Sequence, residues 1–252
     1  MSEDAGMARR IALVTGANRG IGLATVAGLA TLGHTVLLGS RSRERGEQAA
    51  EPLRAEGLDV RPIAVDVTDD DGVRLAAAAV EADFGRLDVL VNNAAIKLEM
   101  APAPPSGSRV EIVRKTFETN VFGTIRVTLA MLPLLRRSGA PRIVFVSSGL
   151  GSLTQSTTLG SKYQAKPLLS YNTSKSAINA VAVQFANELR DEGFKVNVAD
   201  PGYTNTDMTR PDGNHGGNRP PEAGAAVVIR LATLPDDGPT AEFHDDRGVV
   251  PW

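Results

Sequence analysis

Short continuous apolar runs recur along the chain, separated by longer stretches with helical periodicity. Residues within these runs do not alternate between apolar and polar, which is typical of strands buried on both faces of a parallel sheet. The runs occupy residues 11–17, 35–40, 87–95, 142–148 and 195–202, with a weaker candidate at 60–67. Helices are predicted between them at residues 20–32, 43–56, 70–84, 109–137 and 171–191.

This alternation of strands and helices predicts an α/β fold, a doubly wound parallel sheet with right-handed crossovers. In such sheets ligands bind at the carboxyl ends of the strands. No internal repeat or linker divides the chain. We therefore expect a single domain over residues 10–252, preceded by a flexible amino terminus at residues 1–9.

The first predicted strand runs into a glycine-rich turn, VTGANRGIG, that opens the first helix. A helix amino terminus offers unpaired N–H groups and the positive end of the helix dipole, which suit a pyrophosphate where no Cβ blocks its approach. Gly16, Gly20 and Gly22 provide that clearance. Their spacing differs from the commoner Gly-x-Gly-x-x-Gly fingerprint. A turn that only packs the helix against the strand is the alternative.

Five motifs follow one another in a fixed order: Thr15-Gly16-x-x-x-Gly20-Ile21-Gly22, Asn92-Asn93-Ala94-Ala95, Ser148, Tyr171-x-x-x-Lys175 and Pro201-Gly202. Together they resemble the short-chain dehydrogenase/reductase family in its compact one-domain form, from about residue 10 to the end of the chain. The resemblance implies a Rossmann-type fold, a nicotinamide cofactor, and hydride exchange between that cofactor and a carbonyl or alcohol.

Two departures from the family pattern are visible. The fourth predicted strand ends Asn-Asn-Ala-Ala where the family usually has Asn-Asn-Ala-Gly. The chain ends RGVVPW and lacks the Val-Asp-Gly-Gly ending of many tetrameric members. In this respect it is similar to the carbonyl-reductase branch.

Two tyrosines are candidates for acid–base chemistry. Tyr171 and Lys175 lie four residues apart on a predicted helix and so share a face, whereas Tyr163 has Pro167 at its fourth position and no helical periodicity around it. A free phenol has a pKa of about 10, and a neighbouring ammonium brings the pKa of the phenol toward neutrality. We predict that Tyr171 donates a proton to the carbonyl oxygen and that Lys175 tunes it. Tyr163 is expected in a loop.

The expected catalytic serine lies in FVSSG, at the end of a predicted strand. Successive strand side chains point to opposite sides, so only one of Ser147 and Ser148 can face a substrate. The family pattern assigns Ser148, which would hydrogen-bond the reacting oxygen as charge develops on it. Asn120 is either a satisfied core amide or, as the resemblance implies, a fourth catalytic member that holds a helix bulge and a water linking Lys175 to solvent.

The resemblance also implies how the cofactor is held. Pro201 and Gly202 would form a rigid turn beside the nicotinamide, and Asp66 would meet the adenine amino group. Thr204 stands where family members often carry Val or Ile. The residues expected to hold the cofactor are Gly16, Asn18, Arg19, Gly20, Ile21, Gly22, Ser40, Arg41, Asp66, Val67, Asn93, Ala94, Ala95, Tyr171, Lys175, Pro201, Gly202, Thr204 and Thr206.

The end of the second predicted strand indicates which dinucleotide is bound. NAD-specific sites place an acidic residue there to bind the ribose 2′-OH, but LLGSRSRER has no acid before Glu44. Ser40 and Arg41 can instead donate to a 2′-phosphate, and Arg19 in the glycine turn adds a second cation. We therefore predict NADP(H). Ordinary solvated surface arginines are the alternative interpretation.

Composition excludes several other classes of function. With 27 Lys and Arg against 29 Asp and Glu, the net charge of −2 produces no field that would attract nucleic acid or an anionic membrane. The chain has no cysteine, so disulfides and thiolate catalysis are excluded. His34, His215 and His244 lack metal-ligand spacing and are interpreted as surface or loop residues, so no metal is predicted. Without a signal-like or membrane-length apolar run, we expect a cytoplasmic protein.

Three functions are considered. We favour an NADPH-dependent carbonyl reductase or ketoreductase acting on an aldehyde or ketone. The alternatives are a secondary-alcohol dehydrogenase that works oxidatively and a non-catalytic NADP-binding regulator, which normally would lack the tyrosine or the lysine.

The stretch from Ser148 to Tyr171 is longer than is typical of the compact family. Its surplus, TTLGSKYQAK at residues 157–166, is predicted to form a lobe over the site, near the helices through which relatives tetramerise. We therefore favour a monomer or homodimer over a tetramer.

Overall fold

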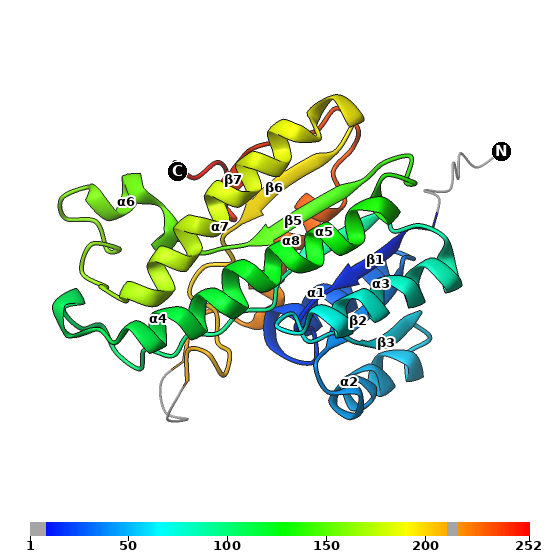
Figure 1. The fold of residues 1–252 in the computed structure, drawn as a ribbon, viewed down its shortest axis with the longest axis horizontal. Helices are drawn as coiled ribbons and strands as arrows, with labels where there is room; N and C mark the ends of the chain where they lie inside the picture. Colours follow the sequence, from blue (N-terminus) through cyan, green and yellow to red (C-terminus); the bar gives the residue numbers. More distant parts are fainter. Residues whose placement is uncertain (1–8, 211–215) are drawn as a thin grey trace.

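A parallel sheet of seven strands, in the order β3-β2-β1-β4-β5-β6-β7, runs through the residues that the computed structural model describes, 9–210 and 216–252 (Figure 1). The order runs outward from β1 in both directions, so the topological switch point lies between β1 and β4. The predicted doubly wound α/β fold of Rossmann type is confirmed. The strands are β1 (Ile11–Val14), β2 (Thr35–Ser40), β3 (Val60–Ala64), β4 (Val89–Asn92), β5 (Arg142–Val146), β6 (Lys195–Ala199) and β7 (Phe243–His244).

Helices cover both faces of this sheet and create two apolar cores. Successive strand residues enter different cores, as Leu13 and Val14 do, which explains why the strands are continuously apolar. One face carries α1 (Gly20–Thr31), α2 (Arg43–Ala55) and α8 (Pro221–Ala232). The other carries α3 (Asp70–Phe84), α4 (Val110–Phe117), α5 (Thr124–Leu135) and α7 (Leu169–Glu188). Within the described residues, no helix combines the length and apolar character needed to cross a membrane.

Most of the predicted strands overrun the observed ones at their carboxyl ends. The run at 11–17 leaves the sheet after Val14, the run at 87–95 after Asn92, and the run at 195–202 after Ala199. These overrunning residues are still largely buried, for example Ala17 at 0% exposure. They lie in loops at the carboxyl edge of the sheet, and an apolar pattern alone does not distinguish such buried loops from strand.

The helix predicted at 109–137 is continuous in the structure, but its middle departs from α-helical geometry. Residues Glu118–Gly123, between α4 and α5, form a π-helical segment, a feature that often marks functional sites. Gly123, the last residue of this segment, packs closely against the loop after β3. A Cβ on Gly123 would lie only 2.7 Å from Cγ2 of Val67. The short helix α6 (Leu153–Thr157), α8 and β7 were not predicted.

The histidines differ from the sequence-based interpretation. His34 and His244 are both buried rather than on the surface. His244 lies in β7, which pairs with β6, and its Nε2 is 2.8 Å from a carboxylate oxygen of Glu242. Burial, with the charge of Arg10, lowers the pKa of His34. His34 lies in the loop between α1 and β2, so only its burial was not expected, whereas for His244 the interpretation was wrong, because a two-residue strand carries no apolar pattern that would reveal it. His215 lies outside the described residues.

The stretch between Ser148 and Tyr171 contains α6 and the loops around it, which lie beside the amino end of α7 at the left of Figure 1; its surplus, residues 157–166, begins at the last residue of α6. The chain's carboxyl end holds it in place: Ser152 donates from Oγ to the Pro251 carbonyl at 2.6 Å, and Thr154 donates from its backbone to the Trp252 carbonyl at 2.9 Å. The monomeric or dimeric state inferred from this segment stays a prediction.

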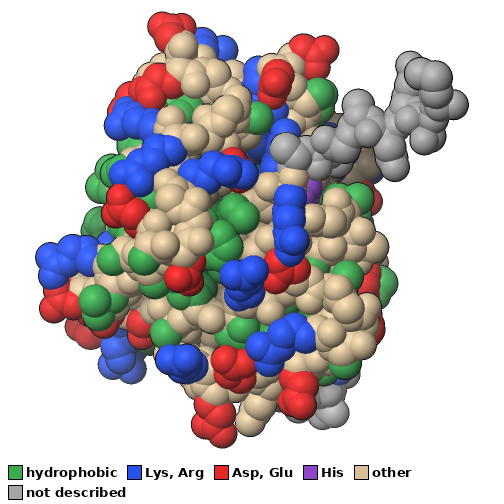
Figure 2. Space-filling view, turned by 90° about the vertical axis from the view of Figure 1, so that its right-hand side faces the viewer, with side chains coloured by type: hydrophobic (Ala, Val, Ile, Leu, Met, Phe, Trp, Pro, Cys, Tyr) green, Lys and Arg blue, Asp and Glu red, His purple; other side chains and the backbone are tan. Residues whose placement is uncertain are grey.

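Charges of both signs alternate on the side of the molecule from which the chain enters β1 (Figure 2). Ion pairs at this end of the sheet include Arg137 with Glu81 and Arg136 with Glu192, each at 2.7 Å. All four side chains are partly solvated, and exposed pairs contribute about 0–1 kcal/mol each. The stability of the fold therefore comes mainly from its two apolar cores.

Truncation in one of these cores tests this view. Leu90 in β4 is fully buried, whereas Leu75 in α3 is 72% exposed. Leu90→Ala should lower the free energy of unfolding by about 2–5 kcal/mol, because it leaves a cavity in the packed core. The matched control Leu75→Ala should change it by less than about 0.5 kcal/mol. Urea unfolding followed by circular dichroism measures both, and equal losses would contradict the assignment of the core.

Candidate active site

A cavity of about 600 Å³ opens at the carboxyl edge of the sheet, at the switch point between β1 and β4. Its walls come from the glycine turn, the ends of β2 to β5, α7 and the loop after β6. The volume is within the range of small-molecule and cofactor sites. Among the predicted cofactor residues, those that line it are Gly16, Asn18, Arg19, Gly20, Ile21, Gly22, Ser40, Arg41, Asp66, Val67, Asn93, Ala94, Ala95, Tyr171, Lys175, Pro201 and Thr206.

The glycine turn is pressed against the end of β4. Thr15 accepts the backbone N–H groups of Asn93 and Ala94 on Oγ1 at 3.0 and 3.1 Å, and Asn93 donates from Nδ2 to the Thr15 carbonyl at 2.8 Å. Gly16 has a φ of +62°, and a Cβ there would lie 2.8 Å from Cα of Ala94. The turn therefore requires glycine for both its conformation and its packing.

The amino end of α1 is left without a protein acceptor. Its capping residue, Arg19, makes no side-chain hydrogen bond to the helix, and the first turn contains no acidic residue. Unpaired N–H groups at the start of a helix attract anions. The turn thus fits a pyrophosphate, as we predicted from its glycine residues.

Cations and a buried hydroxyl surround the part of the cavity next to β2. Ser40 is buried and accepts the backbone N–H of Ser42 on Oγ at 3.3 Å, while Arg41 and Arg45 both line the cavity. Arg19 makes an ion pair with Asp207 of the loop after β6, although both side chains are largely exposed. Arg45, which sequence reasoning missed, lies in the first turn of α2, four residues after Arg41.

Asp66 is held as an acceptor at the end of the segment that follows β3. Its Oδ1 accepts the backbone N–H and the hydroxyl of Thr68 at 3.0 and 2.7 Å. Although burial opposes it, these hydrogen bonds hold the pKa of Asp66 below its usual range. Asp66 is therefore ionised at neutral pH and ready to accept a hydrogen bond from a bound amino group.

Tyr171 and Lys175 lie on one face of α7, which begins two residues before the predicted start. Both are buried, and Lys175 Nζ donates to the Val146 carbonyl at 2.8 Å and lies 5.7 Å from the centroid of the Tyr171 ring. α7 has no side-chain cap of its own. Instead, the carboxylate of Glu99 accepts the backbone N–H groups of Ser170 and Tyr171 at 2.9 and 3.0 Å.

The pKa values of Tyr171 and Lys175 differ from those expected from the sequence. Burial, with the negative charge of Asp200, raises the pKa of Tyr171, although a hydrogen bond from Ser148 opposes the rise. Burial lowers the pKa of Lys175 to about 8, and here the charge of Asp200 opposes the fall. Lys175 was expected to lower the pKa of the phenol. In the folded chain the loss of solvation dominates the pKa of Tyr171, which is a neutral phenol.

The two serines after β5 point in different directions, as strand geometry requires. Ser147 is buried and donates from Oγ to the Lys175 carbonyl at 3.3 Å. Ser148 acts on the phenol of Tyr171 so as to lower its pKa, and accepts the Leu150 N–H on Oγ at 3.2 Å. Ser148 is thus the serine next to the phenol, although it is not among the residues that line the cavity. Ser147 does line the cavity, and it also fastens α7 to β5.

Asn120 lies in the π-helical segment and is a satisfied core amide. Its Nδ2 donates to the Ile96 carbonyl at 2.9 Å and to Ser174 Oγ at 3.0 Å, and its Oδ1 accepts the Ile96 N–H at 2.8 Å. It therefore joins the loop after β4 to α7. The bulge that the resemblance implied is present; the contact to Lys175 through water stays a prediction.

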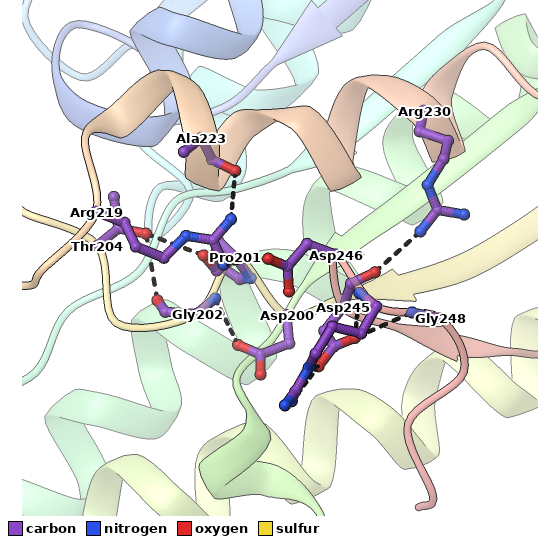
Figure 3. Close-up of polar contacts among 11 residues, drawn as sticks. Asp200, Pro201, Gly202, Thr204, Arg219, Ala223, Arg230, Asp245, Asp246 and Gly248 are labelled. Carbon is purple, nitrogen blue, oxygen red and sulfur yellow. Dashed lines mark hydrogen bonds and ion pairs between the residues drawn. The ribbon is translucent and has the colours of Figure 1, made fainter.

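Thr204, expected at the cofactor, turns its side chain away from the cavity. It is buried, and its Oγ1 donates to the Pro201 carbonyl at 3.0 Å. Neither Thr204 nor Gly202 lines the cavity. Both shape the turn after β6, and Arg219 seals that turn, because a Cβ on Gly202 would lie 2.8 Å from Nη1 of Arg219 (Figure 3).

Comparison with known proteins places the chain in a family. The family model described as short chain dehydrogenase matches residues 10–215. The chain belongs to this family. It is 38% identical over 235 residues to the short-chain dehydrogenase anuI of Penicillium roqueforti, covering 91% of the chain and 90% of the relative. It is 33% identical over 281 residues to carbonyl reductase [NADPH] 1 of Sus scrofa, covering 96% and 94%.

A solved structure shows the same fold. Salutaridine reductase from Papaver somniferum superimposes with a TM-score of 0.81 and 28% sequence identity, covering 94% of this chain and 99% of that chain. This member of the short-chain dehydrogenase family is thus a carbonyl-reductase-like, NAD(P)-dependent oxidoreductase. Within the described residues, no cluster of three or more His, Cys, Asp or Glu residues could hold a metal ion.

Adding one methyl group tests the glycine turn. A Cβ on Gly22 would lie 2.8 Å from Cα of Ala17 and 2.9 Å from the Gly16 carbonyl oxygen, both rigid backbone atoms. Gly22→Ala should therefore weaken dinucleotide binding at least about tenfold, equivalent to about 1.4 kcal/mol. Gly139→Ala is the control, since no atom lies within 4 Å of its added Cβ. Fluorescence titration with NADPH measures both, and wild-type affinity in Gly22→Ala would refute the role of the turn.

Proposed function

We propose that this enzyme is an NADPH-dependent carbonyl reductase that reduces an aldehyde or ketone. One observation carries the proposal: a buried, neutral phenol, Tyr171, borders the cavity, with Ser148 close enough to influence its pKa and Lys175 beneath its ring. Such an arrangement can deliver a proton to a carbonyl oxygen that gains negative charge. The printed name of the Sus scrofa relative, carbonyl reductase [NADPH] 1, supports the same reaction class.

When bound, NADPH supplies the hydride for the carbonyl carbon. The protein's own groups manage the oxygen: Ser148 stabilises the charge that develops on it, and Tyr171 transfers its proton to it. Lys175, whose pKa is lowered to about 8 by burial, still carries its proton at neutral pH and stabilises the phenolate that remains. Asn120 and Glu99 act indirectly, because they fasten α7 to the loop after β4.

The neutral state of Tyr171 is the form that carbonyl reduction needs. Oxidation of an alcohol requires the phenolate as a base, and both burial and the charge of Asp200 disfavour that form. Reduction requires the neutral phenol, which these same effects preserve. We therefore propose that the enzyme reduces a carbonyl substrate rather than oxidising a secondary alcohol.

The choice of NADPH rests on the residues next to β2. Ser40, Arg41 and Arg45 border the cavity there, and none of the residues in LLGSRSRER before Glu44 is acidic. Guanidinium groups bind a phosphate well because several N–H donors can point at its oxygens. Arg19 is a weaker candidate than the sequence indicated, since Asp207 competes for its guanidinium.

A substrate screen with two tyrosine variants tests the reaction. Wild-type protein should oxidise NADPH in the presence of aldehydes or ketones, with product chirality read out. Tyr171→Phe should lose about 10²–10⁴-fold in kcat, because the hydroxyl that donates the proton is removed, yet still bind NADPH. Tyr163→Phe should retain most of the activity. Comparable losses in both variants would show that Tyr171 is not the specific proton donor.

Arginine variants test the cofactor preference. Arg41→Ala should raise the KM for NADPH by about ten- to a hundredfold, because one charged hydrogen bond contributes about 1.5–3 kcal/mol. The KM for NADH should stay almost unchanged. Arg43→Ala is a matched control, because Arg43 is exposed and does not line the cavity. Efficient use of NADH by the wild type, or an equal loss for both cofactors, would argue against NADPH.

A further inference from the structure

The proton donor lies in the part of its helix that is most easily disrupted. Tyr171 is the third residue of α7, which begins at Leu169. The ends of a helix fray because their first N–H groups have no acceptor within the helix. The residue before α7, Leu168, makes no capping hydrogen bond, and the first turn contains no acidic residue. The sequence of α7 by itself therefore leaves the backbone at Tyr171 without a cap.

A carboxylate from a distant loop takes the place of the cap. Glu99, in the loop after β4, accepts the backbone N–H of Ser170 on Oε1 at 2.9 Å and that of Tyr171 on Oε2 at 3.0 Å. These are the second and third residues of α7, whose N–H groups a capping side chain normally binds. The negative charge of the carboxylate also lies at the positive end of the helix dipole. Both oxygens of Glu99 are thus bound to the first turn of α7.

The same loop is attached to the start of α7 at a second point. Ala103 donates its backbone N–H to the Pro167 carbonyl at 3.0 Å, just before the helix begins. Closer to β4, Ile96 of this loop lines the cavity, and Asn120 binds both the N–H and the carbonyl of Ile96. One segment therefore connects the wall of the cavity to the backbone of the proton donor.

Lys175 and the cofactor residues depend on other contacts. Lys175 lies one turn further into α7, where backbone N–H groups find acceptors within an α-helix. Its Nζ donates to the Val146 carbonyl at 2.8 Å. The glycine turn is fastened by Thr15 and Asn93 to the end of β4. Loss of the bonds from Glu99 should therefore loosen Tyr171 more than the groups that hold the dinucleotide.

We propose that Glu99 is a positioning residue for carbonyl reduction, because it caps α7 from outside the helix and thereby holds the phenol of Tyr171 at the reacting oxygen. The inference rests on the proposed function, in which Tyr171 donates the proton. A catalytic group misplaced by about 1 Å can lower a rate by about 10²-fold. The loop after β4 thus determines how well the proton donor is placed, although Glu99 itself transfers no proton.

Steady-state kinetics of Glu99 variants test this role. Glu99→Ala removes both acceptors and should lower kcat for a carbonyl substrate from the screen at least about tenfold. Its Kd for NADPH should change by less than about twofold. Glu99→Gln retains the length of the side chain, but its amide NH₂ group cannot accept the second N–H, so kcat should fall between those of wild type and Glu99→Ala. A wild-type kcat in Glu99→Ala, or an equal loss of NADPH affinity, would overturn the proposal. If Glu99→Ala does not fold, Glu99→Gln decides by the same criteria.

Two control variants separate position from stability and from charge. Asp69→Ala removes the side chain that caps α3 by accepting the Asp71 N–H at 3.1 Å. It should lower the thermal midpoint about as much as Glu99→Ala does, yet leave kcat unchanged. Glu111→Gln removes an exposed carboxylate of α4 and should alter neither quantity. A fall of kcat in Asp69→Ala as large as that in Glu99→Ala would show that lost stability alone explains the effect.

Hydrogen exchange distinguishes this proposal from the proposed function, since it needs neither cofactor nor substrate. The chain has three tyrosines, so ¹⁵N-tyrosine labelling gives three amide signals, and Tyr171→Phe identifies the signal of Tyr171. In Glu99→Ala this amide should exchange at least about tenfold faster than in wild type, because its acceptor is lost. The amide of Tyr203 serves as the internal reference. An unchanged exchange rate at Tyr171 would refute the capping role of Glu99 even if carbonyl reduction is observed. Absence of carbonyl reduction by the wild type would remove the proposed function, and the exchange rate would still decide whether Glu99 caps α7.

Discussion

The contact between α7 and the loop after β5 places the chemistry of this enzyme. Gly151 allows the two backbones to meet, because a Cβ there would lie 2.8 Å from both the carbonyl carbon and Cβ of Lys175. Its carbonyl accepts Ser176 Oγ at 3.0 Å and Asn179 Nδ2 at 3.2 Å. Ser147 and Lys175 add bonds in both directions between the helix and β5. This close packing is what brings Tyr171 next to Ser148 at the edge of the cavity.

The same packing determines the electrostatics of the site. Groups that prefer water, a phenol, an ammonium and a carboxylate, are held where little water reaches them. Burial therefore changes the proton affinities of Tyr171 and Lys175 more than any single neighbour does. Burying polar and charged groups generally costs stability, and natural proteins tolerate that cost mainly at functional sites. The apolar cores on both sides of the sheet provide the stability that offsets it.

Hydrogen bonds across the carboxyl edge of the sheet hold the site's loops in register. Thr15 and Asn93 fix the glycine turn to the end of β4, and Asn120 fixes the loop after β4 to α7. Each bond links segments that are far apart in the sequence. The cavity is therefore built by long-range contacts between short loops, while the sheet supplies a rigid base for all of them.

The sequence by itself determined the architecture and the residue types of the site. Continuous apolar runs identify strands buried on both faces, and the four-residue spacing of Tyr171 and Lys175 places them on one helix face, because both signals are local. Only the tertiary structure decided the roles of Glu99 and Arg45, the burial of His244, the direction of the Thr204 side chain and the raised pKa of Tyr171. Each of these depends on which distant segments come together in the fold. Neighbouring residues in the sequence do not show how far a side chain loses its contact with water, or which partners the fold places beside it.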